Sequence, residues 1–336
     1  MRILLSYGTR PEWIKIKPLV EAFKSNNIEY ECLFTGQHTD LLSTQIFDYE
    51  IKIQQTESNR LNNIISSILT KDLPWDKWNY VLTQGDTASA YAMTLAAFNN
   101  NVKTIHLEAG LRSYNLQHPY PEEAYRQMIS RIADINFCPT RLSELNLRNE
   151  QAQGKIYTVG NTVLDNLKKY KDKCTYGNTV IVTLHRRENH KIIKQWFSHL
   201  NVIAQKHNEL KFIFPVHSNP NIKKYVDILT DVQCIDPVSY DVMLDMLIKS
   251  KFIITDSGGL QEEGAFLNKK VIVCRETTER PEGINTGHLY MCKKPGQLID
   301  IVSQVNTSPE WKADCPYGDG YSAQKICDIL TNEKLD

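Results

Sequence analysis

Short apolar runs alternate with longer amphipathic stretches along most of the chain. In the first half the runs cover residues 2–7, 30–36, 80–85 and 103–110. In the second half such runs occur at 179–185, 210–217, 232–237, 251–259 and 270–276. Continuous apolar runs of this length are typical of parallel strands that are buried on both faces. The pattern therefore predicts an α/β protein with two Rossmann-like, doubly wound parallel sheets, one in each half.

A segment without apolar periodicity separates the two halves. From about Leu167 to Thr179 the chain is polar and rich in lysine, which indicates a hinge. We expect an N-terminal domain over 1–168, a C-terminal domain over 169–318, and a final helix within 319–336 that packs back on the first domain. A length of 336 residues agrees with this division, because domains commonly contain about 150 residues.

The composition argues against two classes of binding partner, nucleic acid and membrane. Lys plus Arg and Asp plus Glu each number 39, so no net charge attracts nucleic acid or an anionic membrane at long range. The chain starts with the strand-like "MRILLSY", and no apolar run reaches the roughly 18 residues of a membrane span. The eight cysteines are scattered without metal-type spacing. We expect a cytoplasmic protein with reduced thiols, no nucleic-acid partner and no membrane partner.

Charged side chains follow the predicted strands of the first half. In open α/β sheets ligands bind beyond the carboxyl ends of the strands, so these loops are where chemistry is expected. The first loop, with Arg10, opens a helix that carries Lys15, and free N–H groups at a helix start favour an anion. Three later loops carry Asp86, Glu108 and Glu122. Any one of them alone would suit a helix cap, but three carboxylates on successive loops indicate proton chemistry.

The second half has loops suited to anions. The string "TDSGGLQEE" ends a strand and starts a helix, so the backbone at Ser257, Gly258 and Gly259 is a candidate phosphate site. Glu263, one turn inside that helix, is better placed for sugar or ribose hydroxyls. His185, His217 and Arg280 lie on neighbouring strand-end loops.

Familiar cofactor and metal motifs are absent from the sequence. "GTRPEW" opens the first helix where a dinucleotide fingerprint would need G-x-G-x-x-G, and no G-x-x-x-x-G-K-[ST] occurs. His106 and Glu108 alternate along one strand, and His185 and His190 are five residues apart, so neither pair has the spacing of H-E-x-x-H. We therefore expect no metal and no cofactor.

Several long strings carry a resemblance to a known family. They are "GTRPEWIKIKPLV", "TGQH", "QGDTASAYAMTLAAF", "HLEAGLRSYNLQHPYPEEAYRQ", "GNTVLDNL", "HRREN", "PVHSNPN", "TDSGGLQEE" and "RETTERPEG". In this order, from about residue 3 to residue 330, the chain closely resembles the non-hydrolysing UDP-N-acetylglucosamine 2-epimerases. The resemblance implies a GT-B fold with an interdomain active-site cleft, a homodimer, and reversible conversion of UDP-N-acetylglucosamine to UDP-N-acetylmannosamine for surface-polysaccharide synthesis.

The same resemblance assigns roles to individual residues. It places Asp86, Glu108 and Glu122 near the reacting sugar. It places the cationic side chains and the imidazole near the diphosphate, namely Arg10, Lys15 and His185. The nucleotide would be bound by Ser257, Gly258, Gly259, Glu263 and Arg280, with Met243 where relatives often have an aromatic residue near the uracil. Some relatives bind a second, activating UDP-sugar through residues that match Gln37 and His217; here Thr39 and Asp40 depart from the pattern.

Other functions stay open at the level of sequence. The substrate of the C2 epimerase could be a related UDP-2-acetamido sugar. A GT-B glycosyltransferase would share the phosphate loop but would also need an acceptor. A hydrolysing epimerase would release free N-acetylmannosamine and UDP, and a non-catalytic sensor would bind a sugar nucleotide without using the carboxylates.

Overall fold

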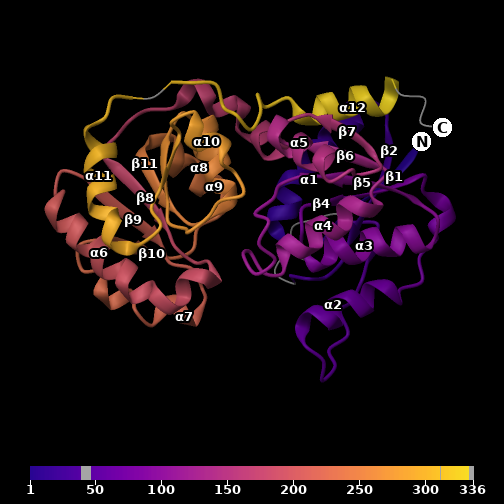
Figure 1. Ribbon diagram of the computed structural model, residues 1–336, viewed down its shortest axis with the longest axis horizontal. Coiled ribbons are helices and arrows are strands. Elements are labelled where there is room, and N and C mark those ends of the chain that lie inside the picture. The colour runs from indigo at the N-terminus through magenta and orange to yellow at the C-terminus, as the bar shows by residue number, and fades with distance from the viewer. Residues whose placement is uncertain (39–46, 311, 333–336) are drawn as a thin grey trace. The chain divides into compact units, whose positions relative to one another are not determined.

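The chain folds into two compact units. The computed structural model describes residues 1–38, 47–310 and 312–332, so Thr39 and Asp40 lie outside the described residues. Unit 1 comprises Met1–Asn166 together with the segment that starts at Gly318, and unit 2 comprises Leu167–Tyr317 (Figure 1).

Unit 1 is built on a parallel sheet with the strand order β3-β2-β1-β4-β5-β6-β7. Its strands are β1 (Arg2–Tyr7), β2 (Glu29–Phe34), β3 (Tyr49–Glu50), β4 (Tyr80–Gln84), β5 (Lys103–Leu107), β6 (Ile135–Cys138) and β7 (Lys155–Thr158). Its α-helices are α1 (Arg10–Ser25), α2 (Arg60–Leu69), α3 (Ala88–Asn99), α4 (Glu122–Ile132), α5 (Arg141–Asn149) and α12 (Ser322–Asn332). A run of 3-10 turns over Thr162–Lys173 leads from this unit into the next.

Unit 2 is also built on a parallel sheet, with the strand order β10-β9-β8-β11-β12-β13. Its strands are β8 (Thr179–Thr183), β9 (Lys211–Pro215), β10 (Gln233–Ile235), β11 (Ser250–Thr255), β12 (Lys270–Val273) and β13 (Leu289–Met291). Its α-helices are α6 (Ile193–Lys206), α7 (Pro220–Lys223), α8 (Tyr240–Lys249), α9 (Gly258–Phe266), α10 (Glu282–Asn285) and α11 (Leu298–Thr307). Neighbouring strands pair in parallel in both sheets, as predicted.

Apolar side chains cover both faces of the first sheet. Ile3 and Leu5 pack on one side with residues of α1, while Leu4, between them, packs on the other side with residues of α2 and α3. Successive residues of a strand point to opposite faces, so a strand buried on both sides reads as a continuous apolar run. The C-terminal helix α12, yellow in Figure 1, lies against α1 and adds Ile326 and Leu330 to the first of these clusters.

Strand order fixes where ligands are expected in each unit. The chain order reverses between β1 and β4 in unit 1 and between β8 and β11 in unit 2. At such a switch point the loops leave in opposite directions and open a crevice at the carboxyl ends of the strands. The loops after these four strands carry Arg10, Asp86, His185 and Ser257.

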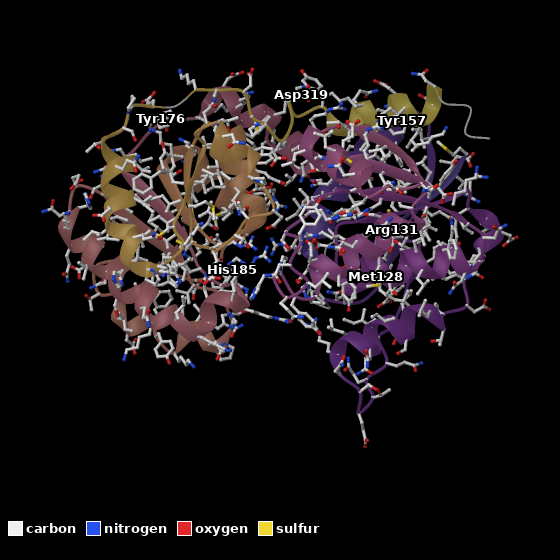
Figure 2. All side chains as sticks on the ribbon, in the orientation of Figure 1. Met128, Arg131, Tyr157, Tyr176, His185 and Asp319 are labelled. Carbon is white, nitrogen blue, oxygen red and sulfur yellow. The ribbon has the colours of Figure 1, made fainter. Side chains whose placement is uncertain are left out.

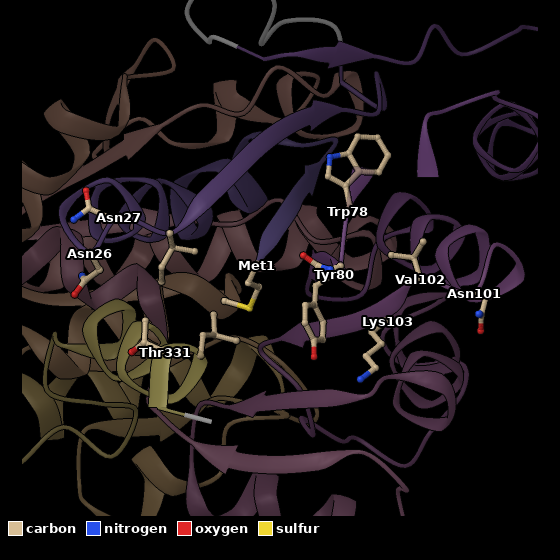
Figure 3. A pocket seen from close by; sticks show the side chains of 12 residues that line it. Met1, Asn26, Asn27, Trp78, Tyr80, Asn101, Val102, Lys103 and Thr331 are labelled. Atoms are coloured by element: carbon tan, nitrogen blue, oxygen red, sulfur yellow. The ribbon is translucent and has the colours of Figure 1, made fainter. Parts of the chain in front are cut away.

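A cavity at the opposite edge of unit 1 lies away from these loops. Its volume is about 800 Å³, and it opens beside the amino ends of β1, β4 and β5, at Met1, Tyr80 and Lys103 (Figure 3). The strand-end loops contribute nothing to its lining. No helix among the described residues has both the length and the apolarity to cross a membrane.

Candidate functional site

The loop between β1 and α1 is closed by a carboxylate of the chain itself. Glu12 accepts hydrogen bonds from the backbone N–H of Gly8 (2.5 Å) and of Thr9 (2.9 Å), and the hydroxyl of Thr87 donates to its other oxygen. Glu12 is fully buried, and this burial raises the pKa of its carboxyl. The N–H groups of Gly8 and Thr9 are thus occupied by Glu12, which completes a capping box with Thr9. The external anion that the sequence led us to expect at this helix start stays a prediction.

A lysine and a glutamate predicted for the site are in direct contact. Lys15, on α1, forms a salt bridge with Glu108, which follows β5, and both side chains are largely buried. Gln84 Nε2 donates to the same carboxylate oxygen, Oε2, and Asn161 Nδ2 donates to Oε1 over 3.2 Å. The backbone of Glu108 has a φ of 66°, a left-handed conformation that a residue other than glycine adopts at a cost of about 1–3 kcal/mol. The surroundings therefore hold Glu108 firmly in a strained position.

Asp86 is held by an arginine on α4. Arg126 Nε donates to Asp86 Oδ2 over 3.0 Å, and Arg126 Nη2 binds the same oxygen. Arg126 also donates to Glu123 of the same helix over 3.2 Å. Its bonds to Asp86 join α4 to the loop after β4. Capping of α3 does not explain Asp86, since Thr87 is the N-cap and accepts a hydrogen bond from the Ala90 N–H. Asp86 thus lies at the carboxyl end of its strand in a salt bridge with Arg126 and not as a helix cap.

Three further residues predicted for the site belong to unit 1, and two of them start helices. Glu122 is the first residue of α4, one residue before Glu123, and is partly buried. Arg10 is the first residue of α1 and is exposed. Gln37 Oε1 accepts hydrogen bonds from the Ser89 hydroxyl (2.7 Å) and N–H (3.2 Å).

A buried histidine beneath this cluster makes stability depend on pH. Burial lowers the pKa of His106 to about 4, and its Nε2 bonds to the Gly85 carbonyl over 2.8 Å. Below its unfolded pKa of about 6.5 the unfolded chain binds a proton that the folded chain does not bind. We therefore expect the free energy of unfolding to fall by up to about 3 kcal/mol between pH 6.5 and pH 4 through this residue.

Denaturant midpoints of the wild type and of His106→Gln, measured from pH 7.5 to pH 4.5, check this expectation. The midpoint of the wild type should fall relative to that of the variant as the pH decreases, because the variant lacks the imidazole whose protonation favours the unfolded chain. Parallel curves over the whole range would contradict it.

In unit 2 a buried aspartate organises the loop after β8. Asp256 is fully buried and accepts hydrogen bonds from the N–H groups of His185 and Arg186 and from Asn189 Nδ2, at 2.9–3.1 Å. The Nδ1 atom of His185, labelled in Figure 2, lies 3.4 Å from Asp256 Oδ1. Burial lowers the pKa of His185, against the opposing effect of Asp256. The carboxylate favours a proton on Nδ1, which leaves Nε2 for a ligand.

His217 is the neighbour of His185. Their rings stack with centroids 5.2 Å apart and an interplanar angle of 8°. His217 Nδ1 accepts a hydrogen bond from the Asn219 N–H over 3.1 Å, which fixes the ring. This residue, predicted as regulatory, is therefore also placed to orient a residue predicted at the diphosphate.

The start of α9 combines open backbone with a buried arginine. Ser257 is the N-cap, and Gly258 and Gly259 are the first two helical residues. A methyl group on Gly258 would lie 2.7 Å from Arg280 Nη1, whereas nothing lies within 4 Å of the corresponding position on Gly259. Arg280 donates to Glu262 over 2.7 Å and binds Glu279. The arginine thus packs against Gly258, where a side chain would collide with it, whereas the position of a side chain at Gly259 is open.

A tyrosine holds the glutamate of the same helix. Tyr240, on α8, donates its hydroxyl proton to Glu263 Oε1 over 2.8 Å. Burial and the nearby carboxylate raise the pKa of Tyr240, so it remains a donor. Met243 lies three residues further along α8, on the same helical face. The predicted residues for ribose and uracil therefore lie on two adjoining helices.

Sequence reasoning missed the residues that support the site. They are Gln84, Arg126, Asn161, Tyr240 and Asp256. Arg126 stands three residues after Glu123, a helical spacing that signals a shared face. The others were not detectable from spacing, because their partners lie far along the chain. Among the described residues no group of three or more His, Cys, Asp or Glu side chains is arranged to hold a metal ion.

The chain is similar to known proteins over nearly its whole length. The family model described as UDP-N-acetylglucosamine 2-epimerase matches residues 21–331. A Campylobacter jejuni UDP-N-acetylglucosamine 2-epimerase is 39% identical, over 99% of this chain and 98% of that protein. The crystal structure of the Neisseria meningitidis UDP-GlcNAc 2-epimerase bound to UDP-GlcNAc has a TM-score of 0.89 at 33% identity and covers 99% of this chain and 100% of that one.

A second similar structure is that of the Methanocaldococcus jannaschii UDP-GlcNAc 2-epimerase in complex with UDP-GlcNAc and UDP. It has a TM-score of 0.83 at 28% identity, over 99% of this chain and 100% of that one. Together with the two parallel sheets, these neighbours confirm the predicted GT-B type of fold.

Proposed function

Because the chain belongs to the UDP-N-acetylglucosamine 2-epimerase family, we propose that it interconverts UDP-N-acetylglucosamine and UDP-N-acetylmannosamine. The observation that carries the proposal is the cluster of carboxylates and cations at the carboxyl ends of β4 and β5. Two of the three predicted carboxylates, Asp86 and Glu108, are each bonded there to a cation. Such a cluster suits a substrate that combines a negative charge with a carbon-bound proton.

The order of bond changes follows from acidity. The C2 proton of a pyranose has no neighbouring carbonyl and is hardly acidic, so the ground state does not lose it to a carboxylate. The C1–O bond therefore breaks first, or nearly so, and its electron pair leaves with the β-phosphate of UDP. The oxocarbenium-like C1 makes the C2 proton labile, a carboxylate takes that proton, and the C2–H electron pair forms the double bond of 2-acetamidoglucal. Addition of UDP to C1, with a proton arriving on the opposite face of C2, gives the epimer.

The cations contribute more to the rate enhancement than the carboxylates do. A unit charge about 4 Å from the departing oxygen is worth roughly 4 kcal/mol at an effective dielectric of 20. A placed general acid or base typically contributes about 10² to 10⁴ in rate. We assign Arg10 and His185 to the diphosphate, with Lys15 serving both the diphosphate and Glu108. Stabilisation of the leaving group then dominates the rate enhancement.

Inversion requires proton transfer on two faces of the sugar. One fixed carboxylate does not reach both faces, so at least two of the three carboxylates act on the substrate. Asp86 and Glu108 have different environments, since a guanidinium binds the first and an ammonium with two carboxamides binds the second. We propose that Asp86 takes part directly in proton transfer, with Glu108 and Glu122 as candidates for the second group.

The nucleotide is assigned to unit 2. We propose that the backbone from Ser257 to Gly259 binds phosphate, that Glu263 binds ribose hydroxyls, and that Met243 lies near the uracil. Arg280 is bonded to two carboxylates, so we assign it to supporting the turn at Gly258. No step of this scheme uses a metal or a redox cofactor.

Incubation with UDP-N-acetylglucosamine, followed by proton NMR, tests the assignment. We expect signals of UDP-N-acetylmannosamine to grow while total UDP-sugar stays constant. Release of free N-acetylmannosamine with UDP would indicate a hydrolysing enzyme instead. Release of UDP only after an acceptor is added would indicate a glycosyltransferase, and turnover of a different UDP-2-acetamido sugar alone would change the substrate.

Three further assignments rest on the family resemblance. We propose a homodimer, a cytoplasmic location, and a role in surface-polysaccharide synthesis. Sedimentation of the purified protein tests the first of these. Activation by a second UDP-sugar through Gln37 and His217 stays a prediction.

A further inference from the structure

The segment Gly160–Asn166 follows β7 and ends where unit 1 meets unit 2 in the sequence. It contains the string "GNTVLDN", to which the mechanism above gives no role. Its polar side chains point into unit 1, and Asn161 and Thr162 are 2% and 0% exposed. Buried polar side chains are retained where their hydrogen bonds matter. The partners of these two residues therefore indicate what the segment does.

Asn161 binds the carboxylate of Glu108. Its Nδ2 donates to Glu108 Oε1 over 3.2 Å, while its own Oδ1 accepts a hydrogen bond from the Val163 N–H, also over 3.2 Å. The second bond fixes which end of the carboxamide faces Glu108. Lys15 and Gln84 bind the other oxygen, Oε2. Asn161 thus stops the carboxylate from rotating about its own axis.

Thr162, the next residue, binds the other partner of the pair. Its hydroxyl donates to the backbone carbonyl of Lys15 over 2.7 Å. This bond holds the turn of α1 from which the lysine side chain reaches Glu108. Two consecutive residues of one segment therefore hold both members of the salt bridge, Glu108 by its side chain and Lys15 by its backbone.

The rest of the segment is anchored independently. Asn166 Nδ2 donates to the carbonyl of Ile14 over 2.9 Å. Asp165 accepts hydrogen bonds from the N–H groups of Ser322 (3.1 Å) and Ala323 (2.8 Å) at the start of α12. The bonds of Asp165 thus hold one end of the segment to α12, while Asn161 binds Glu108 at the other end. The strained backbone of Glu108 requires support of this kind from its neighbours.

We propose that Asn161 and Thr162 are positioning residues that hold the Lys15–Glu108 pair in the geometry needed for proton transfer at C2 and departure of UDP. The proposal rests on the proposed epimerase function. In this proposal both residues act through Lys15 and Glu108. Displacement of a reacting group by about 1 Å can cost about 10²-fold in rate, so loss of either bond should lower kcat and leave KM nearly unchanged.

The experiment compares variants that each disrupt one of the two contacts. Asn161→Asp keeps the size of the side chain but replaces the donor by a carboxylate oxygen that repels Glu108. Thr162→Val removes the hydroxyl without changing the volume. We expect both to lower kcat by about 10-fold to 10²-fold with KM within threefold of the wild type. Thr162→Ser keeps the donor and should restore kcat to within about threefold of the wild type, a rescue that a packing role would not predict.

The matched control is Asn166→Ala. Asn166 belongs to the same segment and also binds a backbone carbonyl of α1, yet it contacts neither Lys15 nor Glu108 through that bond. Its kcat should stay within about twofold of the wild type. Melting temperatures and UDP affinity by calorimetry, measured on all four variants, check that each protein is folded.

The outcomes separate this proposal from the one on which it rests. If the wild type does not epimerise UDP-N-acetylglucosamine, the proposed function fails first. If the wild type is active but Asn161→Asp and Thr162→Val match its kcat, the positioning role is wrong. It is also wrong if Asn166→Ala loses as much activity as they do, or if Thr162→Ser is as slow as Thr162→Val.

Discussion

Asp86→Asn is expected to lower kcat by about 10² to 10⁴, the usual contribution of a placed general acid or base. The carboxamide has nearly the shape of the carboxylate and can still accept a hydrogen bond from Arg126, so the loop after β4 should keep its position. It no longer accepts a proton from carbon. Exchange of the C2 proton with solvent, followed by NMR, should therefore nearly vanish, while UDP affinity by calorimetry should change less than threefold.

The matched control is Glu150→Gln. Glu150 forms a similar carboxylate–guanidinium pair with Arg112, at 2.8 Å to both Nε and Nη2, but none of the proposed chemistry uses it. This variant should keep its exchange rate within about twofold of the wild type. Retained exchange in Asp86→Asn would remove Asp86 from proton transfer.

His185→Gln is expected to lower kcat by about 10² to 10³, the range found when one preorganised donor to a developing anion is removed. Burial lowers the pKa of His185 in the free protein, so the imidazole is neutral near pH 7. A bound diphosphate favours the charged form, because an anion raises the pKa of a neighbouring imidazole. Binding of UDP should therefore take up a proton, and affinity should rise as the pH falls from 8 to 6.

Calorimetry of UDP binding in two buffers with different ionisation enthalpies measures that proton uptake. The wild type should show it and His185→Gln should not. His199→Gln, which changes a histidine on α6 bonded to the Gln195 carbonyl, should behave as the wild type. Equal proton uptake in the wild type and His185→Gln would assign it to another group and contradict the role given to His185.

The architecture was largely predictable because its central strands are buried on both faces. The runs at β1, β4, β8 and β11 are continuous stretches of mainly apolar residues, and few elements other than buried parallel strands produce that pattern. Four strands, β3, β6, β7 and β13, gave no such signal. In β6 the apolar run is interrupted by the buried Asn136, and β7 lies at the sheet edge with its residues partly exposed. Edge strands are half solvated, so hydrophobicity identifies them poorly.

The candidate site was predictable as a set of loops but not as a set of bonds. Strand ends position Asp86 and Glu108 in unit 1 and His185 in unit 2, and a parallel sheet brings the carboxyl ends of its own strands to one edge. Which cation binds which carboxylate depends on side-chain geometry between distant segments. The salt bridge of Lys15 with Glu108 joins residues 93 positions apart, and Asn161 reaches Glu108 over 53 positions. Such contacts leave no periodicity in the sequence.

The most direct test of the account is the turnover of UDP-N-acetylglucosamine in D₂O with NMR detection at C2 of the sugar. Loss of UDP makes that proton labile, so every inversion should introduce one deuterium from solvent, without any added nicotinamide. Both UDP-sugars should carry the label at C2 once equilibrium is reached. Formation of the epimer with its original proton still at C2, or a requirement for a hydride carrier, would contradict the account.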